Sequence, residues 1–456
     1  MERLTAWIDR QYDHAARQMM RSISPAGIVK TRPGFDQMIR PAPGAVIASP
    51  VPAAYDPDPD YFFHWYRDSA IVIDALRLLH EAGQVGPEAP RLFGEFARFS
   101  AALSRLDGRE LTAASGRWRA RIAPEFAQYV RPDTELECVH GEAIAAETRV
   151  NPDGTLDITR WARPQNDGPP LRALTVVRWM RSASLDGGVR PVCEGLLRED
   201  LRFTRERWRS PCYDIWEEER GLHYFTLRVG AQALEEGADW LEAQGERGAA
   251  RGCRTEAQAI LDALDGYWMS DSGYYRSRVL DSGEPSSKEL DIAVVLAALQ
   301  AGDDRDTHSV RDPRIHATLG ALDSLFEADY PINHGRPALR GPALGRYRGD
   351  RYYSGGAYYF STLAAAELCY RAASGGGRDA LLARADRYLE TVRAFTPESG
   401  DMSEQFDQRT GEQTSAKHLA WSYAAFISCA SARRAAVTES PGAIVDGGTP
   451  SEGVSR

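Results

Sequence analysis

The feature that most constrains this chain is the recurrence of apolar residues at helical spacing along most of its length. Apolar side chains at positions i, i+3, i+4 and i+7 form the one face that a helix buries in a folded protein. The pattern occurs in about twelve separate stretches, and each of them predicts a helix. The predicted helices cover residues 4–22, 68–82, 90–106, 170–184, 193–206, 221–243, 255–268, 289–300, 313–325, 357–373, 378–395 and 415–434.

The segment between residues 111 and 165 lacks this periodicity, and its scattered Thr, Val and Ile residues favour short strands instead. The residues on which this expectation depends are Thr112, Val130, Thr148, Val150, Thr155 and Ile158. Twelve helices joined by loops indicate stacked helical hairpins, which either close into a ring or stack openly as a solenoid. No repeat of fixed length is visible, which argues against the solenoid. The predicted fold class is therefore all-α.

Domain organisation follows from where the helices stop. No linker rich in Pro, Ser and Thr divides the chain, so residues 1–436 are expected to form one domain. Residues 437–456 are polar and rich in turn-forming Gly and Pro, and they predict a disordered tail.

Composition and charge exclude several classes of protein. Hydrophobic residues make up 43% of the 456 residues and charged residues 26%, values typical of a globular protein. No apolar run reaches the ~20 residues that a membrane-spanning helix needs. The net charge is -10 and no basic tract is present, so we expect neither a membrane nor a nucleic acid as a partner. Ten Trp and nineteen Tyr residues offer flat faces for sugar rings, although the alternative that they only fill the core stays open at this point.

Short motifs give expectations about location and cofactors. The first ten residues lack the basic and apolar regions of a signal peptide, which favours a cytoplasmic location. No glycine-rich phosphate loop is present, and no cysteine or histidine cluster has the spacing of metal ligands, so we expect no cofactor and no metal. The six cysteines are widely spaced, and free thiols are at least as consistent with this spacing as disulfides are. They are Cys138, Cys193, Cys212, Cys253, Cys369 and Cys429.

Aromatic and charged residues concentrate in alternate connections, those that precede the second, fourth, sixth, tenth and twelfth helices. In a ring of hairpins, all of these connections emerge at the same end, so we expect their side chains to surround a pocket there. The connections concerned contain Tyr61, Trp65, Arg67 and Asp68, then Trp161, then Trp216, Glu217 and Glu218, then Arg346 and Asp350, and finally Glu404. Asp167 lies among them, but we expect it only to cap the helix that follows.

Two of these carboxyls have different sequence neighbours. Glu217 follows Ile215 and Trp216 and is flanked by further acids, which favours a protonated side chain that can donate. Glu404 has neutral neighbours, so we expect it to stay ionised and to act as a base. Each residue has a plainer interpretation, Glu217 as part of a solvated helix start and Glu404 as an exposed loop carboxylate. Two carboxyls in different environments, set among aromatic rings, are suited to breaking a glycosidic bond.

Five blocks of the sequence, in the same order, resemble glycoside hydrolase family 15, the glucoamylases. The likeness extends from about residue 4 to residue 434. The blocks are Tyr61-Phe62-x-x-Trp65-x-Arg67-Asp68-Ser69, Trp161-x-Arg163-Pro164-Gln165-x-Asp167-Gly168-Pro169, Asp214-x-Trp216-Glu217-Glu218, Gly345-Arg346-Tyr347-x-x-Asp350-x-Tyr352-Tyr353 and Ser403-Glu404-Gln405. The last block continues into Gly411-Glu412-Gln413 and Leu419-x-Trp421-Ser422-Tyr423.

The resemblance implies an (α/α)6 barrel that forms a single catalytic domain. It implies that Glu217 is the catalytic acid and Glu404 the catalytic base. The substrate-binding residues that it implies are Arg67, Asp68, Arg346 and Asp350 for the hydroxyls of the terminal sugar, Tyr61 and Trp65 for its ring, Glu218 for a neighbouring hydroxyl, and Trp161, Trp216 and Trp421 around the pocket.

The activity implied by the resemblance is that of an inverting exo-acting α-glucosidase, which releases β-D-glucose from the non-reducing ends of α-glucans or malto-oligosaccharides. His64, Ala162 and Tyr358 depart from the family pattern, and they put the preferred linkage and chain length in doubt. The first alternative is a hydrolase of the same fold that acts on trehalose, isomaltose or α-1,6-linked dextran. A more distant alternative is a sugar-binding protein without catalysis.

Overall fold

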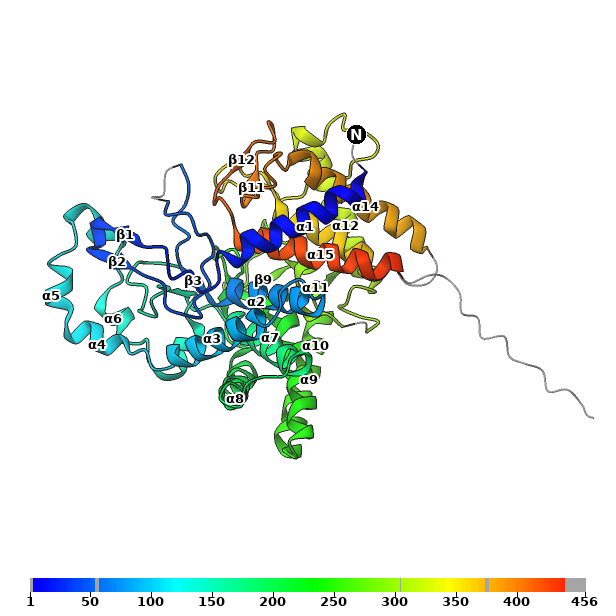
Figure 1. Cartoon of the computed structure of the whole chain (residues 1–456). Helices are drawn as coiled ribbons and strands as arrows, with labels where there is room; N and C mark the ends of the chain where they lie inside the picture. The colour runs from blue at the N-terminus through cyan, green and yellow to red at the C-terminus, as the bar shows by residue number, and fades with distance from the viewer. Residues whose placement is uncertain (1–2, 54–56, 304, 374–376, 439–456) are drawn as a thin grey trace, which may run out of the picture.

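Six helices of the computed structural model form a closed ring in which each helix packs against the next (Figure 1). In chain order they are α2 (Tyr66–Glu81), α7 (Gly168–Ser182), α9 (Tyr224–Ala243), α11 (Ala293–Ala301), α13 (Tyr359–Ala372) and α15 (Ala420–Thr438). Contacts between α15 and α2 close the ring. The structure describes residues 3–53, 57–303, 305–373 and 377–438. Ring helices such as α11 and α13 are apolar around most of their circumference, and nearly all of their residues are buried between neighbouring helices.

A second set of six helices packs outside the ring. These are α1 (Leu4–Met20), α3 (Glu88–Leu103), α8 (Arg190–Arg207), α10 (Arg247–Asp265), α12 (Pro313–Asp329) and α14 (Arg378–Phe395). The last five each contact the ring helix that precedes them in the chain, and α1 contacts α15. They bury a single stripe, as α10 does with Cys253, Ala257 and Leu264. The twelve predicted helices and the (α/α)6 barrel are therefore confirmed.

Short antiparallel sheets fix the connections at the N-terminal ends of three ring helices. β3 (His64–Trp65) pairs with β4 (Arg149–Val150) before α2. β5 (Cys212–Tyr213), β6 (Arg220–His223) and β9 (Arg278–Leu280) form a sheet before α9, and β10 (Ala357–Tyr358), β11 (Gln405–Phe406) and β12 (Gln413–Thr414) form one before α13. The remaining pairs are β1 (Lys30–Arg32) with β2 (Gln37–Ile39) and β7 (Trp268–Met269) with β8 (Tyr274–Tyr275). The helix predicted from residue 221 therefore begins at Tyr224, because β6 occupies its first residues.

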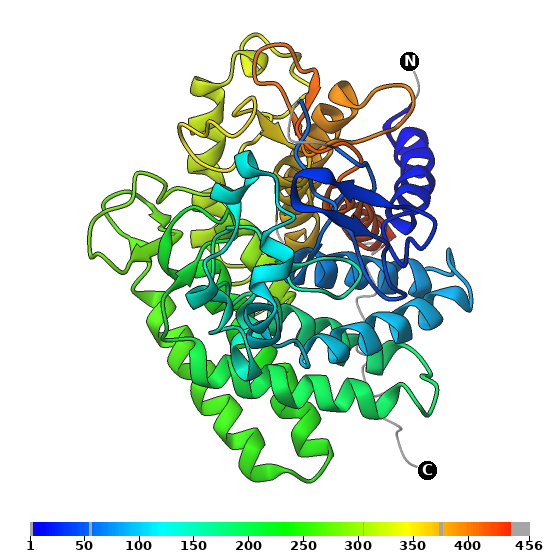
Figure 2. The same cartoon turned by 90° about the vertical axis from the view of Figure 1, so that its left-hand side faces the viewer.

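The segment between α3 and α7 forms a lobe beside β1 and β2, in front of the ring in Figure 2. The expectation of strands in this segment is wrong for most of it. The described strand is β4 alone, with single bridges from Val130 to Thr159 and from Val150 to Leu156. The rest contains the short helices α4 (Gly108–Ala113), α5 (Ser115–Arg119) and α6 (Asp133–Leu136), and 3-10 turns at Pro124–Tyr129 and Gly141–Ala146. Apart from those at β4, its strand-forming residues are too scattered to build a ladder. Val130 and Ile158 pack in a small apolar cluster with Phe35, and Val150 packs in a second one with Tyr66 and Phe99.

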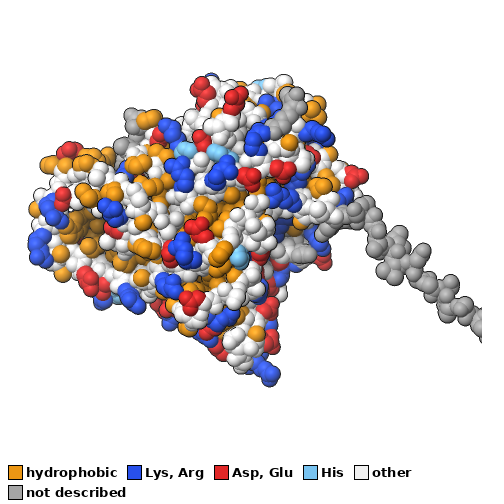
Figure 3. All heavy atoms as spheres, in the orientation of Figure 1, with side chains coloured by type: hydrophobic (Ala, Val, Ile, Leu, Met, Phe, Trp, Pro, Cys, Tyr) orange, Lys and Arg blue, Asp and Glu red, His pale blue; other side chains and the backbone are white. Residues whose placement is uncertain are grey.

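The structure also bears on the expected tail, on the cysteines and on the surface of the protein. α15 continues to Thr438, two residues into the predicted tail, and residues 439–456 lie outside the described part of the chain. All six cysteines are free thiols. Among the described helices, none is long and apolar enough to cross a membrane. The face in Figure 3 carries acidic and basic side chains interspersed over the surface.

Candidate active site

The loops at the N-terminal ends of the ring helices surround a cavity of about 50 Å³, which we call the rim cavity. Its lining residues are Tyr61, Trp65, Arg67, Asp68, Ile215, Trp216, Glu217, Arg346, Phe360, Glu404, Leu419 and Trp421. Nine of the twelve residues that the sequence predicts for the site are among them. The other three, Trp161, Glu218 and Asp350, hydrogen-bond to residues that line it. Larger hollows of about 870, 710 and 380 Å³ lie elsewhere, but the rim cavity joins two carboxyls to aromatic and hydroxyl-binding groups.

A tight turn before β6 directs Glu217 into the rim cavity. The backbone of Glu217 has a φ of +66°, a left-handed conformation that costs a non-glycine residue on the order of 1–3 kcal/mol. The Asp214 carboxylate holds this turn, because it accepts hydrogen bonds from the backbone N–H groups of Trp216 at 2.8 Å and Glu219 at 3.1 Å. Arg278 neutralises Asp214 at 2.7 Å. Buried hydrogen bonds around one carboxylate thus stabilise the strained position of Glu217.

Three donors hold the Glu217 carboxylate. The indole N–H of Trp65 donates to Oε1 at 2.8 Å, and Arg67 donates to the same oxygen at 3.3 Å. The indole N–H of Trp161 donates to Oε2. Ile215 and Trp216 line the same cavity, but the two tryptophans that contact the carboxylate present the N–H edges of their rings to it. Both oxygens are therefore fixed in direction.

Glu404 lies on the loop before β11 and is buried. Ser415 donates to its Oε2 at 2.5 Å, and the Tyr61 hydroxyl donates to Oε1 at 3.4 Å. Burial raises the pKa of Glu404 to about 7, with Asp68 adding to the effect and Ser415 and Arg346 opposing it. A carboxyl with this pKa is about half protonated at pH 7, so the ionised form that the sequence predicts for Glu404 predominates only above neutral pH. Its sequence neighbours are neutral, but the fold removes the carboxyl from water.

The raised pKa of Glu404 predicts a pH-dependent stability. Between pH 4.5 and about 7 the folded protein binds the proton that the unfolded chain has released, so the free energy of unfolding falls as the pH rises. Over this window Glu404 is expected to account for a loss of about 3 kcal/mol. The measurement is urea unfolding of the wild type and of Glu404→Gln at pH 4, 5.5 and 8. The wild type should lose stability relative to the variant as pH rises, and a constant difference would contradict the prediction.

A cluster of charged groups flanks the cavity beside Glu404. Arg346 binds the Asp350 carboxylate with two hydrogen bonds, from Nε at 2.7 Å and from Nη2 at 2.6 Å. The same Nη2 reaches Glu218 at 3.1 Å. Glu218 also accepts from Lys288 at 2.7 Å and from the Tyr347 hydroxyl at 2.5 Å. These pairs fix several donors and acceptors beside the rim cavity before any ligand arrives.

Stacked aromatic rings form one wall of the rim cavity. Phe360 and Trp421 are parallel within 9° with ring centroids 4.5 Å apart, and Trp216 stacks on Phe360 at 6.0 Å. The Trp216 indole N–H donates to Asp291 at 2.8 Å, which fixes the ring. Trp161 is 36% exposed and leaves part of its surface free at the opening. Such flat surfaces suit the apolar faces of sugar rings.

Asp167 is a site neighbour that the sequence analysis misassigned. It makes no capping hydrogen bond to α7; its carboxylate lies 3.5 Å from the Arg67 guanidinium instead, and burial raises its pKa to about 6. The second and third positions of α7 are Pro169 and Pro170, which have no N–H group for Asp167 to cap. The two prolines are visible in the sequence, so the capping role could have been excluded from the sequence alone.

Three further residues of the site were missed by sequence reasoning. Phe360 lies inside α13 and resembles any core residue in sequence. Ser415 lies eleven residues after Glu404 and falls outside the matching blocks, in the gap between Gln413 and Leu419. Lys288 precedes α11 in a connection at the same end of the ring as the others, and its place could have been inferred from that alternation. Within the described residues, no three His, Cys, Asp or Glu side chains are grouped so as to hold a metal ion.

Comparison with known proteins places this arrangement among enzymes. The family model described as glycosyl hydrolases family 15 matches residues 36–93, 146–381 and 377–431. Glucoamylase 1 of Rhizopus oryzae is 26% identical over an alignment that covers 95% of this chain and 72% of that protein. The intracellular sporulation-specific glucoamylase of Saccharomyces cerevisiae is also 26% identical, over 93% of this chain and 83% of that one. A solved structure of the Hormoconis resinae glucoamylase has a TM-score of 0.76 and 25% identity, and covers 95% of this chain and 74% of its own.

Proposed function

The chain belongs to glycosyl hydrolase family 15, and from that premise we propose that Glu217 and Glu404 carry out inverting hydrolysis at the non-reducing ends of α-glucans. The chain is a glycoside hydrolase, and its activity is that of a glucan 1,4-α-glucosidase. The observation that most supports the two assigned residues is that both carboxyls line one cavity while different donors hold them.

The reaction needs one proton delivered and one removed. Glu217, when protonated, transfers its proton to the glycosidic oxygen as the bond from this oxygen to the anomeric carbon breaks. Glu404, when ionised, takes a proton from water as the water oxygen bonds to the anomeric carbon from the opposite face. Attack from the opposite face inverts the configuration, so the first product is β-D-glucose. Inverting enzymes hold the two carboxyls about 6.5–9.5 Å apart so that a water fits between them.

Binding of a single terminal sugar follows from the shape and charge of the rim cavity. Arg67 and Asp68 are hydrogen-bonded to each other at 3.0 Å, and Arg346 is held by Asp350, so these groups keep fixed directions for sugar hydroxyls. The stacked rings of Phe360 and Trp421 close the cavity toward the inside of the barrel. A cavity that is closed at its base admits a chain end and excludes the middle of a chain.

A substrate panel tests this function and separates it from the alternatives. Maltose, maltotriose and starch should release glucose, and proton NMR should show the β anomer first, before mutarotation. Trehalose and isomaltose serve as the comparison, because the same two glutamates could act on either. Release of α-glucose would contradict inversion, and hydrolysis of trehalose or isomaltose alone would assign the enzyme to that substrate instead. Tight binding of maltose without hydrolysis would favour a sugar-binding protein.

The remaining expectations about the whole protein are part of the proposal. A cytoplasmic location is supported by one relative, the yeast glucoamylase whose name describes it as intracellular. Residues 1–436 are proposed to act as one catalytic domain. The absence of a nucleic-acid partner stays a prediction from the net charge of -10.

A further inference from the structure

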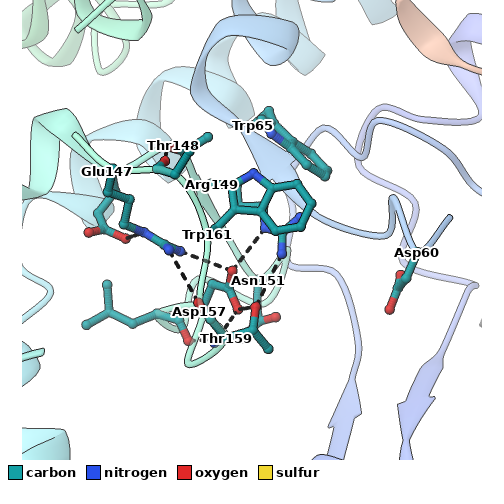
Figure 4. Close-up of polar contacts among 12 residues, drawn as sticks. Asp60, Trp65, Glu147, Thr148, Arg149, Asn151, Asp157, Thr159 and Trp161 are labelled. Atoms are coloured by element: carbon teal, nitrogen blue, oxygen red, sulfur yellow. Dashed lines mark hydrogen bonds and ion pairs between the residues drawn. The ribbon is translucent and has the colours of Figure 1, made fainter. Parts of the chain in front are cut away.

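Arg149 lies directly behind the two indoles that hydrogen-bond to Glu217 (Figure 4). It is the cross-strand partner of Trp65, because β4 pairs with β3 in that register. Its guanidinium carbon is 3.6 Å from the centroid of the Trp161 ring and 4.8 Å from that of Trp65. The sequence analysis did not single out Arg149, and the proposed mechanism gives it no role.

Hydrogen bonds fix the guanidinium in this position. Arg149 Nε donates to Asp157 at 2.9 Å, and Nη2 donates to the Thr159 hydroxyl at 3.2 Å. Arg149 and Asp157 are each only 1% exposed. Arg163 also donates to Asp157, at 3.1 Å, so the carboxylate keeps a second cationic partner. A buried ion pair with this many hydrogen bonds has one geometry, and Arg149 is therefore a rigid support.

The support matters because Trp161 is the most exposed ring of the site, with 36% of its surface accessible. A ring at the edge of a cavity has free space into which it can rotate. A guanidinium that lies over the face of an indole is attracted to the electron-rich ring and holds the plane of the ring. A fixed plane also fixes the direction of the N–H group that Trp161 donates to Glu217.

We propose that Arg149 is a positioning residue for the catalytic acid: through the indoles of Trp161 and Trp65 it holds the Glu217 carboxyl in the orientation that proton transfer requires. This role rests on the proposed function, and Arg149 itself does not line the rim cavity. Its contribution should therefore affect the chemical step rather than the binding of substrate.

The kinetic test compares Arg149→Met with Arg172→Met. Arg172 is a matched control, because it is a buried arginine that binds Asp200 with two hydrogen bonds, at 2.9 and 2.6 Å, away from the rim cavity. Both variants should lower the Tm. Arg149→Met should also lower kcat on maltose about 10²-fold with little change in KM, and Arg149→Lys should recover part of this loss because the charge remains. Equal kcat values for the two Met variants, or an effect on KM alone, would overturn the proposal.

A spectroscopic measurement keeps the test independent of activity. In protein labelled with ¹⁵N-tryptophan, the indole N–H resonance of Trp161 should shift in Glu217→Gln, which identifies the hydrogen bond. The same resonance should shift in Arg149→Met and stay in place in Arg172→Met. An unmoved resonance in Arg149→Met would refute the positioning role even in an enzyme with full activity. If the wild type hydrolyses no α-glucoside, the proposed function fails, while this measurement still decides whether Arg149 orients Trp161.

Discussion

Glu217→Gln is expected to lower kcat on maltose by about 10²–10⁴-fold, the contribution typical of a general acid. The amide has the same size as the carboxyl, but it has no acidic proton to transfer to the glycosidic oxygen. Its carbonyl oxygen can take the place of Oε1 and accept from Trp65 and Arg67, while its NH2 group then faces the Trp161 N–H. The other residues that line the rim cavity are unchanged, so KM should change much less than kcat. Steady-state kinetics with maltose and maltotriose measure both parameters.

A substrate with an acidic leaving group makes this prediction specific. The fluoride ion of α-D-glucosyl fluoride leaves without being protonated. Glu217→Gln should therefore retain far more of its activity on α-D-glucosyl fluoride than on maltose. Glu219→Gln is the matched control, because Glu219 belongs to the same acidic run but binds Arg278 and Ser286 and does not line the rim cavity. If Glu217→Gln lost as much activity on the fluoride as on maltose, Glu217 would have a role other than that of the acid.

Glu404→Gln is expected to lower kcat at least as much as Glu217→Gln does on maltose. The loss should be the same on maltose and on α-D-glucosyl fluoride. Every substrate of an inverting enzyme needs an activated water, and the neutral amide cannot accept its proton. The variant should be at least as stable as the wild type above pH 7, since it lacks the charge that burial disfavours there. Kinetics and urea unfolding on the same preparation therefore separate loss of the base from loss of the fold.

Glu367→Gln controls for the removal of a buried carboxyl. Glu367 lies in α13, accepts a hydrogen bond from Ser428 at 2.8 Å, and has a pKa that burial raises, but it does not line the rim cavity. The Glu367→Gln variant should hydrolyse maltose at nearly the rate of the wild type. Activity of Glu404→Gln within tenfold of Glu367→Gln would remove Glu404 from the mechanism.

The sequence alone predicts those parts of the structure that depend on the spacing of apolar residues and on the order of the helices. Helical periodicity predicts the twelve long helices, and alternation of the connections predicts that residues as distant as Arg67 and Glu404 meet at one end of the ring. The resemblance of five blocks then names twelve site residues, of which nine line the rim cavity.

The electrostatic environment of individual groups could not be predicted in the same way, because it depends on contacts between distant segments. The pKa of Glu404 follows from burial by several loops, and the N–H groups that reach Glu217 come from connections 56 and 152 residues away in the chain. The lobe before α7 has no periodicity, so its short helices and the place of Arg149 behind Trp161 required the three-dimensional structure. Asp167 is different, since the two prolines after it already exclude a capping role.

The wall of stacked rings has a consequence for how a long polymer is degraded. Phe360 and Trp421 line both the rim cavity and the larger hollow inside the barrel, so their stacked rings separate the two. We therefore expect the incoming chain end and the outgoing sugar to share one opening. The freed monosaccharide sits beneath the shortened polymer and cannot diffuse away until that polymer withdraws. If each cut requires a fresh encounter, we expect distributive degradation, in which many polymer molecules are shortened a little at a time and none is followed to its end.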